Sequence, residues 1–110
     1  MDKHTALYCR TATPDPAAIA QQRITLQDFA GAQAFGTTVL YEDDGYTGSN
    51  TDRPAFTRLE QDIRDGKVAR VLAVSVTRLG RNIEEVLQWA RALHDQGVEL
   101  IIPKGGPNYA

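Results

Sequence analysis

The segment VARVLAVSV, residues 68–76, is an almost unbroken run of apolar side chains. A run of this kind is typical of a β-strand that is covered on both faces, as the strands of parallel sheets are. Three shorter strand-like segments occur at residues 5–9, 38–41 and 98–102. We therefore predict a sheet of four strands.

Helical segments separate these strands. A first helix is predicted over roughly residues 17–34, with Asp15 as its cap. Pro54 suits the first turn of a second helix, and Gly66 ends it. Asn82 can cap a third helix, whose expected buried stripe consists of Ile83, Val86, Leu87, Ala90 and Leu93. The alternation predicts one α/β domain over residues 1–110, a three-layer α/β/α sandwich around a small, mostly parallel four-stranded sheet.

The composition is that of an ordinary globular protein, with 42% hydrophobic and 24% charged residues. No apolar run is long enough to cross a bilayer, and residues 1–4 lack a signal-peptide pattern, so we expect a cytoplasmic protein. The single cysteine, Cys9, cannot form an internal disulfide, and no Cys/His cluster has zinc spacing. We expect neither a metal nor a cofactor. Because the net charge is −2, any site for a polyanion must be local.

Polar or functionally suggestive residues follow three of the predicted strands. These candidates are Arg10, Ala12, Asp43, Arg53, Thr77, Arg78 and Arg81. Because ligands of open α/β sheets bind at the carboxyl ends of the strands, the candidates are expected to face one crevice. Four guanidinium groups that lie close together repel one another, so the arrangement makes most sense if an anion neutralises them.

Three segments resemble the signature motifs of the serine recombinases, the resolvase and invertase family. Residues 8–13, YCRTAT, are similar to the family's Tyr-x-Arg-Val-Ser-Thr motif. Residues 43–48 and 52–54 are similar to its Asp-x-Gly-x-Ser-Gly and nearby Arg-Pro, and residues 77–81 to its Asp-Arg-Leu-x-Arg. Order and spacing agree across nearly the whole chain, which implies the fold of the resolvase catalytic domain.

The resemblance also implies a chemistry. In this family a serine hydroxyl attacks a DNA phosphodiester, and a metal-free site compensates the charge on the phosphoryl oxygens with arginines. By resemblance, Arg53 assists at such a site, and the phosphate is cradled by Arg10, Arg78 and Arg81.

Gln21 and Asp43 would orient the loop, according to the same resemblance. Each also has a structural interpretation, because Asp43 can cap a turn and Gln21 can be a solvated helix residue. The arginines likewise could form structural ion pairs with Asp43, Asp44 and Glu84. For a lone arginine we favour the ion pair, and for four at the family's spacing we favour the anion site.

Two departures from the family pattern bear on activity. Ala12 stands where the family has its serine, and Thr77 stands where it has an aspartate. Removing the nucleophile of a serine protease lowers its rate by about a million-fold, so we expect the ordinary reaction to be absent or severely impaired. Thr11 and Thr13 flank the position, but on an extended segment they point away from the side to which residue 12 points.

The sequence leaves three functional hypotheses. The first is an inactive or impaired catalytic domain connected with site-specific DNA recombination, whose partner is the DNA phosphate backbone. The second is a non-enzymatic module that binds phosphates or regulates a recombinase-like chain by homo- or heteromeric contact, and the third is a structural remnant. No membrane partner is expected. The family's long dimerisation helix and DNA-binding domain are not expected in this chain, and residues 103–110 are predicted to be a loop.

Overall fold

The computed structural model describes residues 3–47 and 52–103. Its four strands are all parallel and lie in the order β2-β1-β3-β4. Their bounds are His4–Thr11 (β1), Thr38–Asp44 (β2), Val68–Leu72 (β3) and Glu99–Ile101 (β4). From β1 the chain runs to β2 on one side, crosses back past β1 to β3 on the other side, and continues outward to β4.

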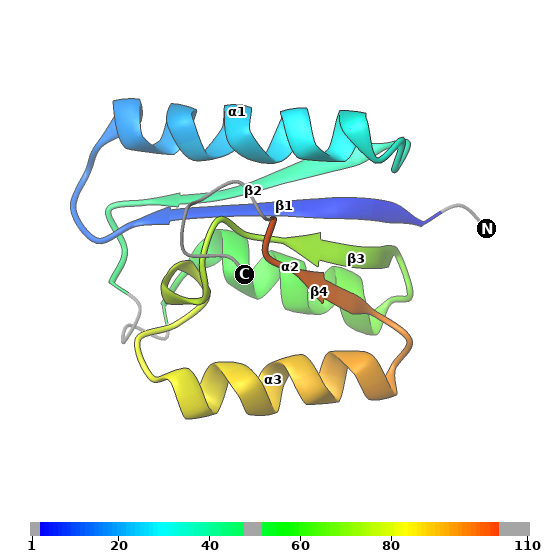
Figure 1. The fold of residues 1–110 in the computed structure, drawn as a ribbon. Helices are drawn as coiled ribbons and strands as arrows, with labels where there is room; N and C mark the ends of the chain where they lie inside the picture. Colours follow the sequence, from blue (N-terminus) through cyan, green and yellow to red (C-terminus); the bar gives the residue numbers. More distant parts are fainter. Residues whose placement is uncertain (1–2, 48–51, 104–110) are drawn as a thin grey trace.

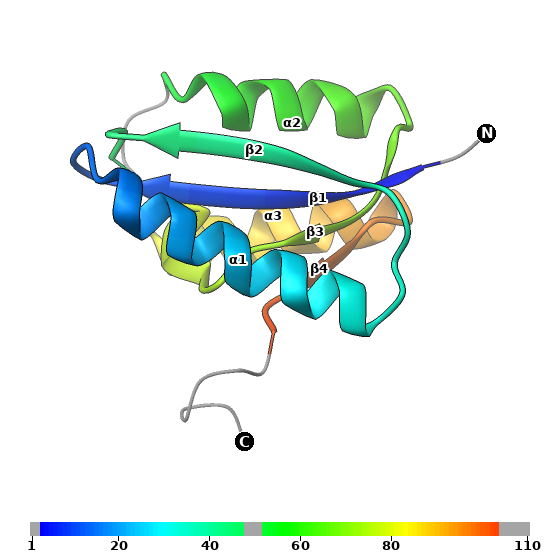
Figure 2. The same cartoon turned by 90° about the horizontal axis from the view of Figure 1, so that it is seen from above.

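Helices cover both faces of this sheet, as Figures 1 and 2 show. The helices are α1 (Pro16–Ala32), α2 (Pro54–Arg64) and α3 (Ile83–Asp95), with a short 3-10 helix, η1 (Val76–Arg78), before α3. In Figure 1, α1 lies above the sheet, and α2 and α3 lie below it. The predicted three-layer α/β/α sandwich is therefore confirmed, and its four-stranded sheet is entirely parallel.

The alternation of side chains along β1 builds two cores. Leu7 and Cys9 pack with Leu26 of α1, whereas Ala6 and Tyr8 pack in the core beneath α2 and α3. All of these side chains are fully buried, and burying a large apolar side chain stabilises a fold by about 1.5–3 kcal/mol. Because both faces of β1 are covered, its sequence is apolar from Ala6 to Cys9.

Both predicted helix caps are present. The Asp15 side chain accepts a hydrogen bond from the backbone N–H of Ala18, and the Asn82 side chain accepts from Glu84 and Glu85. These bonds satisfy backbone donors that have no partner within the helix, which is why short polar residues stand at these positions.

The third and second strands differ most from the prediction, whereas the bounds of the first and fourth differ by one or two residues. The third strand ends at Leu72 rather than Val76, because the chain turns there into η1. The second strand continues to Asp44, beyond the predicted end at Tyr41. Its polar end is stable as a strand because the side chain of Asp43 is buried in a network of hydrogen bonds.

The predicted stripe of α3 is wrong at two positions. Val86 and Leu93 are buried, but Ile83 is 57% and Leu87 is 54% exposed. The helix packs against the short edge strand β4 and against η1, so only a narrow stripe of it reaches the core. Val86 and Leu93 define that stripe, and Trp89 extends it as a partly buried side chain packed against the same core.

Within the described residues, no helix is both long and apolar enough to cross a membrane. Pro103 follows β4 without regular structure, and the rest of the tail predicted as loop, residues 104–110, lies outside the described residues.

Candidate functional site

The carboxyl ends of the parallel strands bring the candidate residues to one edge of the sheet. Arg10 lies at the end of β1 and Asp43 at the end of β2, whereas Arg78 lies in η1, which follows β3. The connection after β1 leads to β2, and the connection after the neighbouring β3 leads the opposite way to β4, so successive connections diverge between β1 and β3. Open α/β sheets bind their ligands at such a point.

Asp43 anchors this edge from the inside. It is 1% exposed. Its carboxylate accepts hydrogen bonds from the Tyr8 hydroxyl at 2.7 Å and from the backbone N–H groups of Ala55 at 2.8 Å and Phe56 at 3.0 Å. The two N–H groups belong to the first turn of α2, where a negative charge also meets the positive end of the helix dipole. Asp43 therefore joins β1, β2 and α2.

Arg53 lies directly beside this carboxylate network and is 8% exposed. Its Nη1 donates to the carbonyl of Leu79 at 2.9 Å and to the Tyr8 hydroxyl at 3.3 Å. The guanidinium carbon lies 4.1 Å from the centroid of the Phe56 ring, which is a cation–π distance. Its Nε is buried and has no hydrogen-bond partner within residues 3–47 and 52–103.

The guanidinium of Arg10 is held by backbone carbonyls. It donates to the carbonyl oxygens of Tyr46 at 2.8 Å, of Arg78 at 3.0 Å and of Thr77. Burial lowers the pKa of Arg10, and the neighbouring charges of Arg53 and Arg78 lower it further, against the opposing effect of Tyr8 and Asp43. Arg10 thus fastens the loop after β2 to η1, a structural role that the resemblance to recombinases did not imply.

Arg78 and Arg81 are the more open of the four arginines. Arg78 is half-buried and donates through Nη1 to the carbonyl of Arg10 at 3.2 Å, while its Nε is buried without a partner among the described residues. Arg81 is exposed and forms no hydrogen bond or ion pair with any described residue. These two side chains therefore keep donors for a ligand.

The alternative ion pairs of these arginines with Asp43, Asp44 and Glu84 are not found among the described residues. Its two ion pairs join Arg23 to Glu42 at 2.6 Å and Arg70 to Glu99 at 4.0 Å, and both lie outside the arginine group. The carboxylate of Asp43 is instead occupied by a hydroxyl and two backbone N–H groups. These two ion pairs consequently do not compensate the charge of the arginine group.

Ala12 is exposed and comes immediately after the last residue of β1. The preceding Thr11 is buried, and its hydroxyl donates to Oδ1 of Asp44 at 2.5 Å. This hydroxyl and the backbone N–H of Asp15 lower the pKa of Asp44. Thr11 is therefore buried and Ala12 exposed, but Thr13 is exposed like Ala12, because the strand ends at Thr11 and the predicted alternation does not continue. The Thr11 hydroxyl is already bonded to the loop after β2.

Gly45 lies where the loop after β2 contacts the loop after β1. It has a φ of +90°, and a Cβ at this position would lie 3.0 Å from Cγ of Pro14. Its N–H donates to the carbonyl of Thr11 at 3.0 Å. Glycine is required here both for the left-handed backbone and for the close approach.

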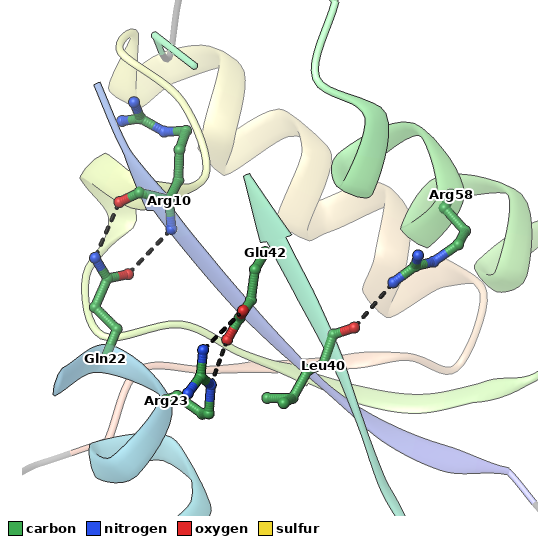
Figure 3. Close-up of polar contacts among 6 residues, drawn as sticks. All are labelled: Arg10, Gln22, Arg23, Leu40, Glu42 and Arg58. Atoms are coloured by element: carbon green, nitrogen blue, oxygen red, sulfur yellow. Dashed lines mark hydrogen bonds and ion pairs between the residues drawn. The ribbon is translucent and has the colours of Figure 1, made fainter. Parts of the chain in front are cut away.

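The glutamine that contacts the end of β1 is Gln22, not the predicted Gln21. Gln22 is buried, and its amide both accepts from the Arg10 N–H at 3.1 Å and donates to the Arg10 carbonyl at 3.0 Å, as Figure 3 shows. Gln21 is exposed. The buried side of α1 is formed by Ile19, Gln22, Leu26 and Ala30, so position 21 faces away from the sheet.

Thr77 is exposed, and its hydroxyl lies 2.6 Å from that of Ser75. The position therefore carries no charge beside Arg78. Among the described residues, no group of three or more His, Cys, Asp or Glu side chains is placed to hold a metal ion.

A parallel α/β sandwich with partly unpaired arginines at the carboxyl edge of its sheet is a fold and a site suited to an anionic ligand. Residues 5–109 match the family model described as the resolvase N-terminal domain, and the chain therefore belongs to the resolvase family of serine recombinases, as a domain of that type.

Comparison with individual proteins agrees. A protein of Bacillus subtilis (strain 168) named "Putative DNA recombinase" is 30% identical over 102 residues, which are 91% of this chain and 20% of that protein. The chain thus spans a fifth of the length of that relative. The N-terminal catalytic domain of TP901-1 integrase is 27% identical with a TM-score of 0.80, over 90% of this chain and 76% of that one. A resolvase family site-specific recombinase from Streptococcus pneumoniae is 31% identical with a TM-score of 0.76, over 91% and 71% of the two chains.

Proposed function

We propose that this domain binds the phosphate backbone of DNA at the carboxyl edge of its sheet and does not cleave it. Ala12 occupies the position of the attacking serine, and Arg78 and Arg81 contact the phosphate. The observation that carries the proposal is an exposed Arg81 without a partner among the described residues, together with a half-buried Arg78 that is bonded to the end of β1 just before the exposed Ala12. Gln22 and Asp43 act as positioning residues behind them.

The absence of a nucleophile at position 12 follows from its side chain. Transesterification at phosphorus begins when an oxygen forms a bond to the phosphorus atom, and the methyl group of Ala12 has no oxygen. The hydroxyl of Thr11 lies on the buried side and already donates to Asp44. The domain consequently has no oxygen at position 12 with which to start the exchange of one ester bond for another.

Thr77 strengthens the binding part of this proposal. A carboxylate at this position would lie next in the chain to Arg78 and would partly neutralise it. The uncharged hydroxyl leaves the arginine charge available to the ligand. Contacts to phosphates carry no sequence information, so duplexes of different sequence are expected to bind this edge with similar affinity.

Binding is tested by fluorescence anisotropy with a labelled DNA duplex at about 50 and 200 mM salt. Each arginine that neutralises one phosphate contributes about 0.9 to the slope of log affinity against log salt concentration. We expect the variant Arg81→Ala to bind more weakly and to lower that slope by about 1. Arg91→Ala is the matched control, because Arg91 is also exposed and without a hydrogen bond or ion pair to the described residues.

Equal effects of the two substitutions would contradict a specific site at the carboxyl edge. No binding at the lower salt concentration would remove DNA as a direct partner of this domain. Denaturing electrophoresis of the same samples is expected to show no covalent protein–DNA adduct, and an adduct would mean that a hydroxyl other than one at position 12 attacks.

A further inference from the structure

A groove of about 170 Å³ opens beside the arginines, between the first turn of α2 and the N-terminal half of α3. Its wall has three parts: two guanidinium groups, two aromatic rings, and a set of aliphatic and polar side chains. The residues that line it are Arg53, Phe56, Leu79, Gly80, Arg81, Asn82, Glu85, Val86 and Trp89. The groove is thus lined both by Arg81, which belongs to the proposed phosphate site, and by Trp89.

The cationic part of the groove has unused hydrogen-bonding capacity. Arg53 is more than nine-tenths buried, and its Nε has no partner among the described residues. Arg81 at the mouth is exposed and unpaired within the same residues. A buried donor without a partner is costly, so the groove favours a ligand that supplies acceptor oxygens near Arg53.

The aromatic part is suited to a flat ring. The rings of Phe56 and Trp89 lie 5.1 Å apart at an angle of 40°, and Val86 is in the groove beside them. One face of Phe56 is already covered by the guanidinium of Arg53. Trp89 is only partly buried, so it is the ring that is available for stacking. Glu85 adds a carboxylate that can accept hydrogen bonds from the amino group of a base.

We propose that this groove binds one unstacked nucleotide of a DNA strand, with its phosphate on Arg81 and Arg53 and its base against Trp89. Paired arginines and aromatic rings are the combination that single strands require, because the charge follows the backbone and the rings stack on the bases. The inference rests on the proposed function, since it places the strand that leaves the phosphate site in the neighbouring groove. An acidic peptide would satisfy the arginines but would leave the aromatic wall without a matching group.

Trp89 is the only tryptophan of the chain, so its fluorescence reports the occupancy of the groove directly. We expect a single-stranded oligonucleotide of about eight nucleotides to quench this fluorescence. An abasic deoxyribose-phosphate oligomer of the same length and charge is the matched control. It is expected to bind about tenfold more weakly than the normal strand and to leave Trp89 unquenched.

The outcomes separate this inference from the proposed function. If both oligomers bind equally and neither changes Trp89, the groove proposal is overturned while the phosphate site stands. If neither oligomer binds, the groove proposal fails, and the duplex titration decides separately whether the phosphate site stands. If a polyglutamate peptide quenches Trp89 and the oligonucleotide does not, the groove accepts an acidic protein segment and the proposal is wrong.

A variant adds a second, independent readout. For Trp89→Leu, we expect fluorescence anisotropy of the labelled oligomers to give nearly equal affinities for the normal and the abasic strand, so that their ratio falls close to one. A preference that persists in the folded variant would place the base elsewhere. Urea denaturation verifies that the variant is folded. If the variant is unfolded, the Trp89 fluorescence of the unaltered chain still tests whether the groove binds a base.

Discussion

Replacing Asp43 with alanine is expected to lower the free energy of unfolding by about 4 kcal/mol. The carboxylate is almost completely buried and accepts from the Tyr8 hydroxyl and from the N–H groups of Ala55 and Phe56. Removing it leaves three donors without acceptors, and each such loss costs about 1–3 kcal/mol. It also leaves the buried guanidinium of Arg53 without its nearby negative charge. Urea denaturation of the variant measures the loss as a lower midpoint at an unchanged m-value.

Asp28→Ala is the matched control for this experiment. Asp28 is exposed on α1 and has no hydrogen bond or ion pair with the described residues, so its replacement is expected to change stability by less than about 0.5 kcal/mol. A loss below about 1 kcal/mol for Asp43→Ala would show that the buried network contributes little to the fold.

Replacing Arg10 with methionine is expected to destabilise the domain by about 3 kcal/mol. Methionine keeps the length of the apolar stem, but the three carbonyls of Tyr46, Thr77 and Arg78 lose their common donor. Relief of the repulsion from Arg53 and Arg78 offsets part of this loss, which is why the expected value is not larger. The measurement is again urea denaturation, with Arg91→Met as the surface control.

This second experiment separates a structural from a ligand-binding role of Arg10. A variant of normal stability that has lost its affinity for DNA would mean that the guanidinium contacts a phosphate rather than the three carbonyls. The expected result is the reverse: below the denaturation midpoint, the part of Arg10→Met that remains folded still binds duplex through Arg78 and Arg81.

Much of the fold follows from local signals in the sequence. Asp15 and Asn82 mark helix starts because a short oxygen-bearing side chain satisfies free N–H groups at a helix start. The apolar run that begins at Val68 identifies a strand covered on both faces. Ile83 and Leu87 have the helical spacing of a buried stripe but are exposed, because burial depends on the width of the sheet beneath α3, which sequence periodicity does not encode.

The site was predictable as a set of positions and less so as a set of contacts. Strand ends bring Arg10, Arg53, Arg78 and Arg81 to one edge, and motif order identifies them. Tertiary hydrogen bonds determine which arginine is available to a ligand. The guanidinium of Arg10 donates to three carbonyls from distant segments, whereas that of Arg81 has no such acceptor among the described residues. Gln22 rather than Gln21 contacts β1 because the rotation of α1 about its axis is set by packing of Ile19 and Leu26.

The central claim is that the carboxyl edge of the sheet binds DNA phosphates, and amide chemical shifts of the isotope-labelled protein test it most directly. During titration with an unlabelled duplex, we expect the largest shifts at Ala12, Arg81 and Asn82. His4 and Lys67 lie at the opposite, amino edge of the sheet and are expected to remain unchanged. Saturable binding that shifts the amides of His4 and Lys67 and leaves those of Ala12 and Arg81 in place would contradict the account.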